Sequence, residues 1–418
     1  METIINSKLK IPQLRFPEFE DEWNVHKIED TFSIFNGYAF SSSDAVKENG
    51  IIWVKIADVG INRMKRDNIS YLPPEFLKKY EKFVLKENDY VIALTRPILS
   101  GKLKIARINS FFNNSLLNQR VGKIVTHHNS RFIFNLLQNS KLISKIENNI
   151  AGSDPPNLSA KEIKNIKVFL PNAFEQQKIA SFLATVDKRI NLLEQKKAKL
   201  EEYKKGVMQR IFSREIRFKD ENGKEFPEWN KTKLKEVLTE HKKNNEEDKY
   251  DEVFSVSKSK GVINQIDHLG RSYAAKSISH YKLVFPFDIV YTKSPTSEFP
   301  FGIIKQNLTG RTGVVSTLYA VLKPKNQHLG YIIHSYFNSW VKTYNYLNPL
   351  VQKGAKNTMN INNKTFLDGK PISLPTSEKE QELISRFLEA LDRKILVLNN
   401  QIETSNKFKK GLLQQMFV

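Results

Sequence analysis

Apolar residues recur at alternating steps of four and three in two separate parts of the chain. This spacing is typical of the seam of a coiled coil. Pro171 and Pro375 stand just ahead of the two parts, where a helix can begin but cannot extend backward. The pattern therefore predicts two long helices, with seam residues Ile179, Leu183, Val186, Ile190 and Leu193 in the first and Ile384, Leu388, Leu391, Ile395 and Leu398 in the second.

The two predicted helices are copies of one another. Residues 175–212 align with residues 380–417 without a gap at an offset of 205, and 13 of the 38 positions are identical. Both copies follow a Leu-Pro, at 170–171 and 374–375, and both carry a Lys-Lys-Gly near their ends. Glu22-Trp23-Asn24 also recurs as Glu228-Trp229-Asn230. The chain therefore repeats a unit made of a variable segment and a constant helix.

The variable segments show the patterns of mixed α/β domains. In the first, apolar and β-branched runs predict strands at 51–56, 90–95, 103–108 and 121–126, and helical periodicity covers 131–150. In the second, the same reading predicts strands at 253–257, 288–292 and 313–322 and a helix at 329–347. In each half a glycine, Gly152 or Gly354, introduces a polar stretch before the Leu-Pro.

These elements predict an α/β fold with an internal twofold-like repeat. Two mixed α/β domains are separated by two long helices, which we expect to pack as an antiparallel coiled coil. The expected bounds are 1–170 for the first domain, 171–213 for the first helix, 214–374 for the second domain and 375–418 for the second helix. The alternative is that each amphipathic helix packs separately on its own domain.

Charge indicates the kind of partner. Lys and Arg number 66 against 45 Asp and Glu, a formal net charge of +21, and most of the excess lies in the variable segments. Such an excess favours a polyanionic partner, nucleic acid before membrane. The chain has no cysteine, which excludes disulfides and cysteine-based zinc sites. It has no run of 18 apolar residues and no apolar region typical of a secretory signal, so we expect a cytoplasmic protein.

Lys, Arg, Asn, Ser, Thr and aromatic residues follow the predicted strands of both variable segments. Lysine and arginine at strand ends suit phosphate contacts, and Asn, Gln and Arg can bind base edges with paired hydrogen bonds. For any one of these residues a solvated surface position explains the sequence equally well, but together they favour nucleic-acid contact. The candidate DNA-binding residues are Lys55, Thr95, Arg96, Ser100, Lys102, Lys104, Asn118, Arg120, Lys258, Lys260, Arg271, Tyr273, Thr292, Lys293, Arg311 and Lys353.

Motifs for catalysis are missing. The sequence has no Gly-x-x-x-x-Gly-Lys-Ser/Thr and no Gly-x-Ser-x-Gly, and its one histidine pair, His127-His128, lacks the spacing of a helical metal site. Asp154-Pro155-Pro156-Asn157 approaches an adenine methyltransferase motif, but the aromatic residue that stacks on the base is replaced by Asn157. We interpret it as a proline-stiffened loop. The sequence therefore predicts a protein that binds nucleic acid without a catalytic centre, metal or cofactor of its own.

The arrangement resembles the specificity subunit of type I restriction–modification systems. The resemblance covers essentially the whole chain. It depends on the Leu-Pro…Glu-Gln-x-x-Ile-x-x-Phe-Leu…Asp pattern at 170–187 and 374–392, and on the Lys-Lys-Gly-x-x-Gln-x-x-Phe at 204–212 and 409–417. One departure is an additional residue between the Leu-Pro and Glu-Gln of the second copy.

The resemblance implies a noncatalytic subunit with two target-recognition domains, each reading one half of an asymmetric bipartite sequence in double-stranded DNA. The helices would set the unread gap and dock two methyltransferase subunits, which bring S-adenosylmethionine, and motor-nuclease subunits would join for cleavage. Two other readings remain open: a coiled-coil scaffold, or a general nucleic-acid-binding protein without sequence readout. A self-sufficient methyltransferase or nuclease is disfavoured because its motifs are missing.

Overall fold

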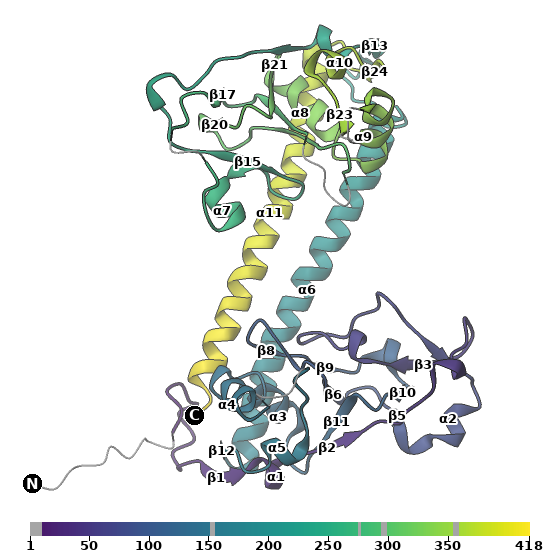
Figure 1. Cartoon of the computed structure of the whole chain (residues 1–418), viewed down its shortest axis with the longest axis vertical. Coiled ribbons are helices and arrows are strands. Elements are labelled where there is room, and N and C mark those ends of the chain that lie inside the picture. The colour runs from purple at the N-terminus through teal and green to yellow at the C-terminus, as the bar shows by residue number, and fades with distance from the viewer. Residues whose placement is uncertain (1–10, 151–154, 275–276, 294–298, 354–358) are drawn as a thin grey trace, which may run out of the picture. The chain divides into compact units, whose positions relative to one another are not determined.

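The computed structural model describes residues 11–150, 155–274, 277–293, 299–353 and 359–418. It divides into two compact units. Unit 1 comprises Met1–Gln195 and Asn400–Val418, and unit 2 comprises Lys196–Asn399. Two long helices, α6 (Ala173–Phe212) and α11 (Glu378–Gln415), each contribute a segment to both units (Figure 1). Gly152 and Gly354, which we expected at the ends of the variable segments, lie outside the described residues.

Unit 1 contains a mixed α/β head, defined as residues 11–170. Its main sheet is antiparallel with the strand order β2-β11-β6-β9, and a second sheet has the order β4-β3-β10-β5. The strands are β1 (Asn24–Lys27), β2 (Ser33–Asn36), β3 (Ile51–Val54), β4 (Tyr71–Leu72), β5 (Val84–Leu85), β6 (Tyr90–Ala93), β7 (Ile98–Leu99), β8 (Lys102–Leu103), β9 (Ile105–Arg107), β10 (Ser115–Leu117), β11 (Val121–Val125) and β12 (Lys167–Leu170). The helices are α1 (Ile28–Thr31), α2 (Phe76–Lys79), α3 (Ser130–Leu136), α4 (Ser140–Ile150) and α5 (Ala160–Ile163).

Unit 2 repeats the main sheet, in a head defined as residues 214–374. The order β14-β21-β18-β19 matches β2-β11-β6-β9 strand for strand, and all these pairs are antiparallel. The strands are β13 (Asn230–Thr232), β14 (Leu238–Glu240), β15 (Phe254–Ser257), β16 (Gly261–Asn264), β17 (Lys282–Val284), β18 (Ile289–Thr292), β19 (Ile303–Gln306), β20 (Gly313–Val315), β21 (Ala320–Pro324), β22 (Gln352–Lys353), β23 (Met359–Asn360) and β24 (Ile372–Leu374). The helices are α7 (Gln265–Leu269), α8 (Gln327–Tyr336), α9 (Trp340–Leu347) and α10 (Asn363–Leu367).

The predicted helix 131–150 is wrong, because the structure has two helices, α3 and α4. Asn139 separates them: its Oδ1 accepts the backbone N–H groups of Lys141 (2.9 Å) and Leu142 (3.3 Å) and so caps α4. The predicted helix 329–347 divides in the same way into α8 and α9, with Ser339 capping α9. The predicted strand 313–322 is also two strands, β20 and β21, separated by a turn in which Tyr319 N–H donates to the Ser316 carbonyl.

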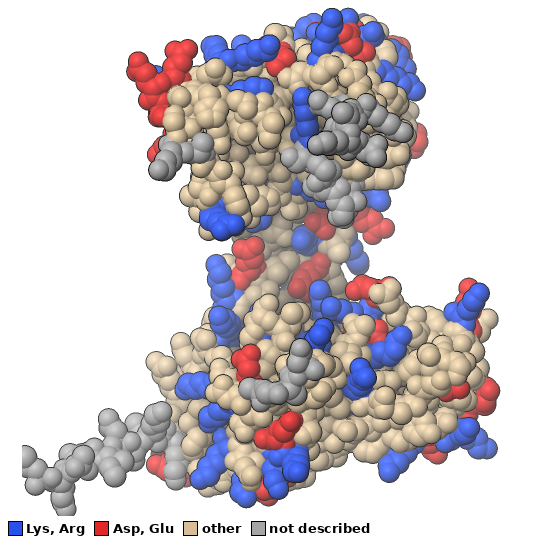
Figure 2. Space-filling view, in the orientation of Figure 1, with Lys and Arg blue, Asp and Glu red and all other residues tan. Residues whose placement is uncertain are grey.

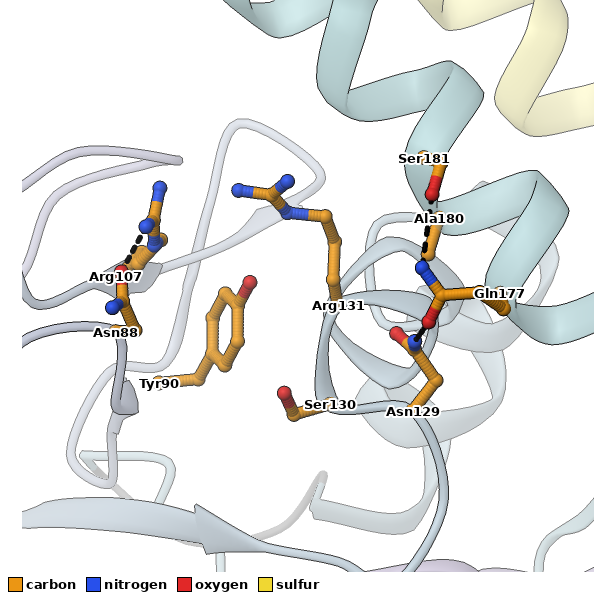
Figure 3. A pocket seen from close by; sticks show the side chains of 9 residues that line it. All are labelled: Asn88, Tyr90, Arg107, Asn129, Ser130, Arg131, Gln177, Ala180 and Ser181. Atoms are coloured by element: carbon orange, nitrogen blue, oxygen red, sulfur yellow. Dashed lines mark hydrogen bonds between the residues drawn. The ribbon is translucent and has the colours of Figure 1, made fainter. Parts of the chain in front are cut away.

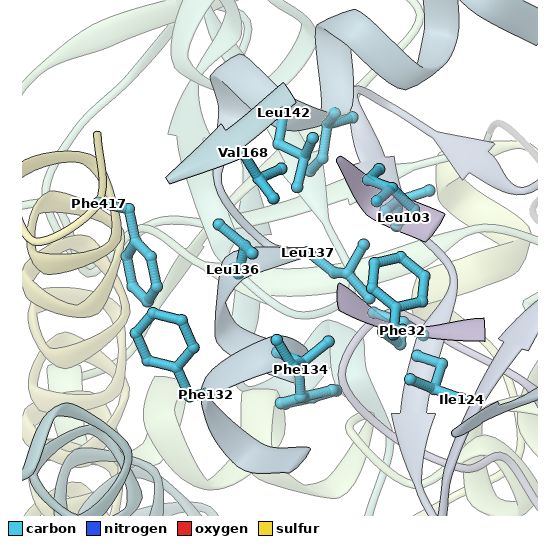
Figure 4. Packing of buried hydrophobic residues seen from close by; sticks show 14 of the residues in the cluster. Phe32, Leu103, Ile124, Phe132, Phe134, Leu136, Leu137, Leu142, Val168 and Phe417 are labelled. Carbon is cyan, nitrogen blue, oxygen red and sulfur yellow. The ribbon is translucent and has the colours of Figure 1, made fainter. Parts of the chain in front are cut away.

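The core of unit 1 includes both long helices. Ile179 and Leu183 of α6 share one cluster with Leu412 of α11 and with Phe417, which follows it. The Phe417 ring lies 5.2 Å from Phe132 of α3, centroid to centroid (Figure 4). In unit 2, Val207 and Ile211 of α6 cluster with Ile384 and Leu388 of α11. In each unit, therefore, an early part of one helix packs against a late part of the other, which is antiparallel pairing.

The predicted fold class is confirmed, and the seam residues have low exposure. Seven of the ten are buried and three, Val186, Leu193 and Ile395, are half-buried. An ion pair between the helices occurs in each unit: Lys409 with Asp187 (2.7 Å) and Lys204 with Asp392 (2.5 Å). The offset of 205 carries Asp187 to Asp392 and Lys204 to Lys409, so the two pairs are the same contact with the helices exchanged.

The repeated Glu-Gln forms the joint between each head and its long helix. Nε2 of Gln176 donates to the Pro171 carbonyl (2.9 Å), and Nε2 of Gln381 donates to the Pro375 carbonyl (2.8 Å). Gln381 Oε1 also accepts from the Asn326 amide (2.9 Å), and Gln176 Oε1 accepts the backbone N–H of Asn129 (3.3 Å). Asn129 and Asn326 are the N-caps of α3 and α8, so the glutamine binds the same element in both heads.

The preceding glutamates are held differently in the two units. The buried Glu175 carboxylate accepts two hydrogen bonds from the Arg15 guanidinium, both 2.7 Å. Glu380 instead accepts from the indole N–H of Trp229 (3.0 Å), and burial raises the pKa of its carboxyl. The joint of unit 1 therefore contains a paired charge, whereas that of unit 2 depends on a neutral donor.

A comparison of two leucines on α11 tests the burial of the seam. Leu398 is 5% exposed and Leu396 is 58% exposed. We expect Leu398→Asp to lower the free energy of unfolding by at least about 3 kcal/mol, because it places a charge in a desolvated contact. The control, Leu396→Asp, should change it by less than about 0.5 kcal/mol. Denaturant unfolding of both variants measures the difference, and equal losses would contradict the seam.

Candidate nucleic-acid interface

A basic groove of about 810 Å³ lies in unit 1 between the head and the long helices. Seven cationic side chains line it against three acidic ones, counting only described residues. The cations are Arg63, Lys65, Lys102, Lys104, Arg107, Arg131 and Lys409, and the acids are Glu87, Asp187 and Glu194. Since Asp187 is already bound by Lys409, the groove presents an excess of positive charge to a ligand.

A second basic groove, of about 730 Å³, lies in unit 2 at the corresponding place. Its cations are Lys204, Lys258, Lys260, Lys305 and Arg393, and its acids are Glu389 and Asp392. Asp392 is bound by Lys204 and by the Tyr331 hydroxyl. Lys and Arg side chains also lie exposed over the surface of each unit, interleaved with acidic ones (Figure 2).

Eight predicted residues of the first head gather at neighbouring strand ends. Lys55 follows β3 and Asn118 follows β10, and these strands pair in parallel with Leu117 opposite Val54. The Lys104 ammonium donates to the Thr95 carbonyl (3.3 Å) just beyond β6. Arg120 is bound to the same strand end, where the Leu94 N–H donates to its carbonyl (2.9 Å). Arg96 and Ser100 are exposed, with φ of 47° and 50°, and Lys102 lies in the β7–β8 hairpin.

Only Lys102 and Lys104 of these eight line the groove itself. Burial, together with the nearby charges of Lys65 and Arg96, lowers the pKa of Lys104. Lys65 lines the groove beside Lys104 and adds a second cation there; it was not among the residues predicted from the sequence. The loop of Pro155, Pro156 and Asn157 lies against the same strand end, where Asn157 accepts a hydrogen bond from Thr95 (2.8 Å). Asp154 lies outside the described residues.

The eight predicted residues of the second head are more dispersed. Lys258 and Lys260 lie in the β15–β16 turn and line the groove of unit 2. The Arg271 guanidinium lies 4.6 Å from the Tyr273 ring, and both residues are exposed in the loop after α7. Thr292 is buried, at 4% exposure, and the adjacent Lys293 is half-buried with its pKa lowered, chiefly by burial.

Two further predicted residues of this head are not simple surface cations. Arg311 forms a two-point ion pair with Glu252, at 2.7 and 2.8 Å, so a nucleic acid would compete with that carboxylate. Lys353 lies in β22, and its side chain is outside the described residues.

Sequence reasoning missed several groove residues. The candidates were taken from the loops after strands, whereas these residues come from a loop, from β9 and β19, and from helices: Arg63, Lys65, Arg107 and Arg131 in unit 1, and Lys204, Lys305 and Arg393 in unit 2. Lys305 follows Ile303 and Ile304 but precedes the polar Gln306 and Asn307, so the sequence carried no signal of its burial, which is costly for an unpaired charge. Within the described ranges no group of three or more His, Asp or Glu residues gathers as a metal site would require.

Lys305 lies deepest among the groove cations. It is 6% exposed, and its ammonium donates to the Asn338 side chain. Burial, with a smaller contribution from Lys204, lowers its pKa to about 8. His334 is buried beside it, and Nδ1 of His334 accepts the Gln306 N–H (3.0 Å). Burial and the charge of Lys305 hold the pKa of His334 well below its usual range, so the imidazole is neutral at pH 7.

Comparison with known proteins agrees with this geometry. Residues 20–202 match the family model of the type I restriction modification DNA specificity domain. The chain is 32% identical over 208 residues to the type I restriction enzyme MjaVIII specificity subunit of Methanocaldococcus jannaschii, a match that covers 49% of each chain. It is 28% identical over 167 residues to the EcoAI specificity subunit of Escherichia coli, covering 39% of this chain and 28% of that one. The chain thus matches half or less of the length of these relatives.

A solved structure shows the fold over nearly the whole chain. The S subunit of a type I restriction–modification system from M. genitalium superposes with a TM-score of 0.62 at 12% identity, over 98% of this chain and 99% of that one. The fold is therefore that of the S subunits. The resemblance predicted from the repeated motifs is confirmed, since residues 20–202 match the model of the DNA specificity domain. None of the helices in the described part of the chain is long and apolar enough to span a membrane.

Replacement of Lys305 tests the cost of its burial. Because its pKa is lower in the folded chain, the unfolded chain binds more protons between pH 8 and 10.5, and stability rises with pH across that window. We expect Lys305→Met to raise the free energy of unfolding at pH 7 by up to about 3 kcal/mol, and this gain should vanish as the pH approaches 10.5. Urea unfolding across pH 7 to 10.5 measures it. A gain that does not depend on pH, or a loss at pH 7, would contradict the assignment.

Proposed function

We propose that the chain is the DNA sequence-specificity subunit of a type I restriction–modification complex. Each head reads one half of an asymmetric, bipartite target in double-stranded DNA. One observation carries this proposal: unit 2 repeats the main sheet and the Glu-Gln joint of the segment that matches the DNA specificity domain. A chain with two such heads has two surfaces for duplex DNA.

The basic grooves support the proposal. Phosphate contacts supply a large share of protein–DNA affinity and position the protein, while base-edge contacts specify the sequence. Each groove combines lysine and arginine with amides that can do the second task, such as Asn62 and Asn109 in unit 1 and Asn338 and Asn399 in unit 2. The two sets of residues differ, so the two half-sites differ.

The subunit itself is noncatalytic in this proposal, and the long helices set the unread gap between the half-sites. Two methyltransferase subunits bring S-adenosylmethionine and methylate adenine, and motor-nuclease subunits join them for cleavage. The complex works in the cytoplasm, where it meets the genomic DNA.

Exposed apolar residues at repeated positions support the docking of two copies of one partner. Leu192 and Tyr203 on α6 are each 54% exposed, and they lie eleven residues, or three helical turns, apart on one face. The offset of 205 carries them to Val397 (53%) and Phe408 (57%) on α11. An apolar residue that is exposed in both copies is a candidate contact for a partner that binds twice.

Exchange of one head tests the readout. We expect that replacing residues 214–374 with the same segment of another specificity subunit changes one half of the methylated motif and leaves the other half and the gap unchanged. Single-molecule sequencing of adenine methylation in cells that carry the partner subunits measures this, with a deletion of the gene as control. A methylated motif that is unchanged, or changed in both halves, would contradict the proposal that each head reads one half of the target.

Charge on the repeated apolar face tests the docking. We expect Leu192→Glu to remove one methyltransferase subunit from the purified complex, and Leu192→Glu with Val397→Glu to remove both, while DNA binding persists. Native mass spectrometry counts the subunits. The control is Lys205→Glu with Lys410→Glu, an exposed repeated pair on the far side of both helices. Full assembly of the double glutamate variant would refute this surface.

A further inference from the structure

A small polar pocket of about 290 Å³ lies in unit 1 beside the basic groove (Figure 3). It is formed where β6, β9 and the start of α3 meet the first turns of α6. Its lining residues are Asn88, Tyr90, Arg107, Asn129, Ser130, Arg131, Gln177, Ala180 and Ser181, and none of these is a carboxylate. Figure 3 shows the guanidinium groups of Arg107 and Arg131 and the hydroxyl of Tyr90 directed toward one open space.

The pocket has a fixed frame. The Tyr90 ring is 5% exposed and lies 4.7 Å from the ring of Phe134, centroid to centroid, so its hydroxyl is held at the pocket. On the α6 side, the Asn129 amide donates to Gln177 (2.6 Å), and the Gln177 amide donates to the Ser181 hydroxyl (3.0 Å). The Arg107 guanidinium also donates to the side chain of Asn88, so the wall of the pocket and one of its two arginines are positioned before any ligand arrives.

Unit 2 lacks both arginines at the equivalent positions. Tyr90 pairs with Arg107 across β6 and β9, and the matching pair in β18 and β19 is Ile289 with Gln306. Counting from the helix caps, Asn129 and Asn326, His328 takes the place of Arg131.

In unit 2 the residues at these two positions, Gln306 and His328, already bind other groups of the protein. The Gln306 amide donates to the Phe287 carbonyl (3.1 Å) and to the Gln327 carbonyl (3.0 Å). Nδ1 of His328 lies 2.7 Å from the Ser385 hydroxyl. The pocket with two arginines is therefore a feature of one head and not of the repeat.

Arginine is suited to phosphate because its planar guanidinium offers paired donors that match two phosphate oxygens. Tyr90, Arg107 and Arg131 also line the basic groove, so the pocket opens into it. We propose that this pocket binds a backbone phosphate of the DNA held by the first head, and that the described residues at the equivalent place in the second head form no such phosphate site. This inference rests on the proposed function, which supplies the DNA.

The test replaces the two arginines of the pocket with the residues found at the equivalent positions of unit 2. In the full chain, Arg107→Gln with Arg131→His removes the phosphate site while keeping hydrogen-bonding side chains. The logarithm of duplex-DNA affinity falls with the logarithm of salt concentration by about 0.9 for each phosphate contact. We expect the slope of the variant to be shallower by about 0.9 than that of the original chain.

Two further variants separate charge and geometry. Lys47→Gln with Lys161→Gln removes two exposed charges of unit 1 that do not line the pocket, and we expect a smaller change in slope from it. Arg107→Lys with Arg131→Lys keeps the charge but not the paired donors, so we expect the original slope with weaker affinity. Thermal unfolding of every variant checks that the fold persists.

The outcomes are distinct. An unchanged slope in the Gln–His variant, in a chain that binds duplex DNA, overturns the phosphate site and leaves the proposed function standing. Failure of the original chain and of its complex to bind duplex DNA at any salt overturns the proposed function, and the phosphate site with it. Calorimetry with inorganic phosphate distinguishes a backbone phosphate from a free phosphate ion as the ligand. If the original chain binds free phosphate and the Gln–His variant does not, while the salt slope of DNA binding is the same for both, the pocket is a small-anion site. That result refutes the contact to the DNA backbone.

Discussion

The contact between α6 and α11 is the constraint on which both units depend. Within each unit a lysine of one helix binds an aspartate of the other, and the partners are exchanged between Asp187–Lys409 and Asp392–Lys204. Each pair also binds its own head: the Lys409 ammonium donates to Gln138 (3.2 Å), and the Tyr331 hydroxyl donates to Asp392. The two lysines are largely buried, so these pairs are less screened than exposed ones. One antiparallel register satisfies both.

The repeated Glu-Gln has a structural role in both units, although the sequences of the two heads differ. In both units the glutamine side chain donates to the carbonyl of the proline that precedes the long helix. Its oxygen accepts from the N-cap residue of a head helix, α3 in unit 1 and α8 in unit 2. In unit 1 the donor to the glutamine is the backbone N–H of Asn129, and in unit 2 it is the side-chain amide of Asn326. The strand ends that carry Thr95, Arg96 and Arg120 make no part of this joint, which leaves them open to variation. The attachment that repeats in both units and the strand-end loops that differ between them are thus separate parts of each unit.

The sequence predicted the repeat, the long helices and the basic character of the heads, because these depend on local periodicity and composition. It did not predict the breaks in the shorter helices, since Asn139 ends one helix partly through a contact to the distant Leu413 carbonyl (2.8 Å). The candidate residues were chosen from strand-end loops, so Arg107 and Arg131 were not among them. Those two arginines lie 24 residues apart, and only the packing of α3 against the sheet brings them to one pocket. Arg311 shows the converse, a cation in a loop that is already paired with Glu252.

The core of unit 1 contains Leu412, Met416 and Phe417, whereas unit 2 is a single uninterrupted stretch of chain. Unit 2 needs no residue beyond Asn399 to complete its core, whereas the core of unit 1 needs residues 412–417. The head that is made first must therefore wait with an open apolar surface around Trp23 and Phe132, the residues that Phe417 later covers. During translation the first head therefore completes its core only once residues 412–417 are available, although most of its residues are made before those of the second head.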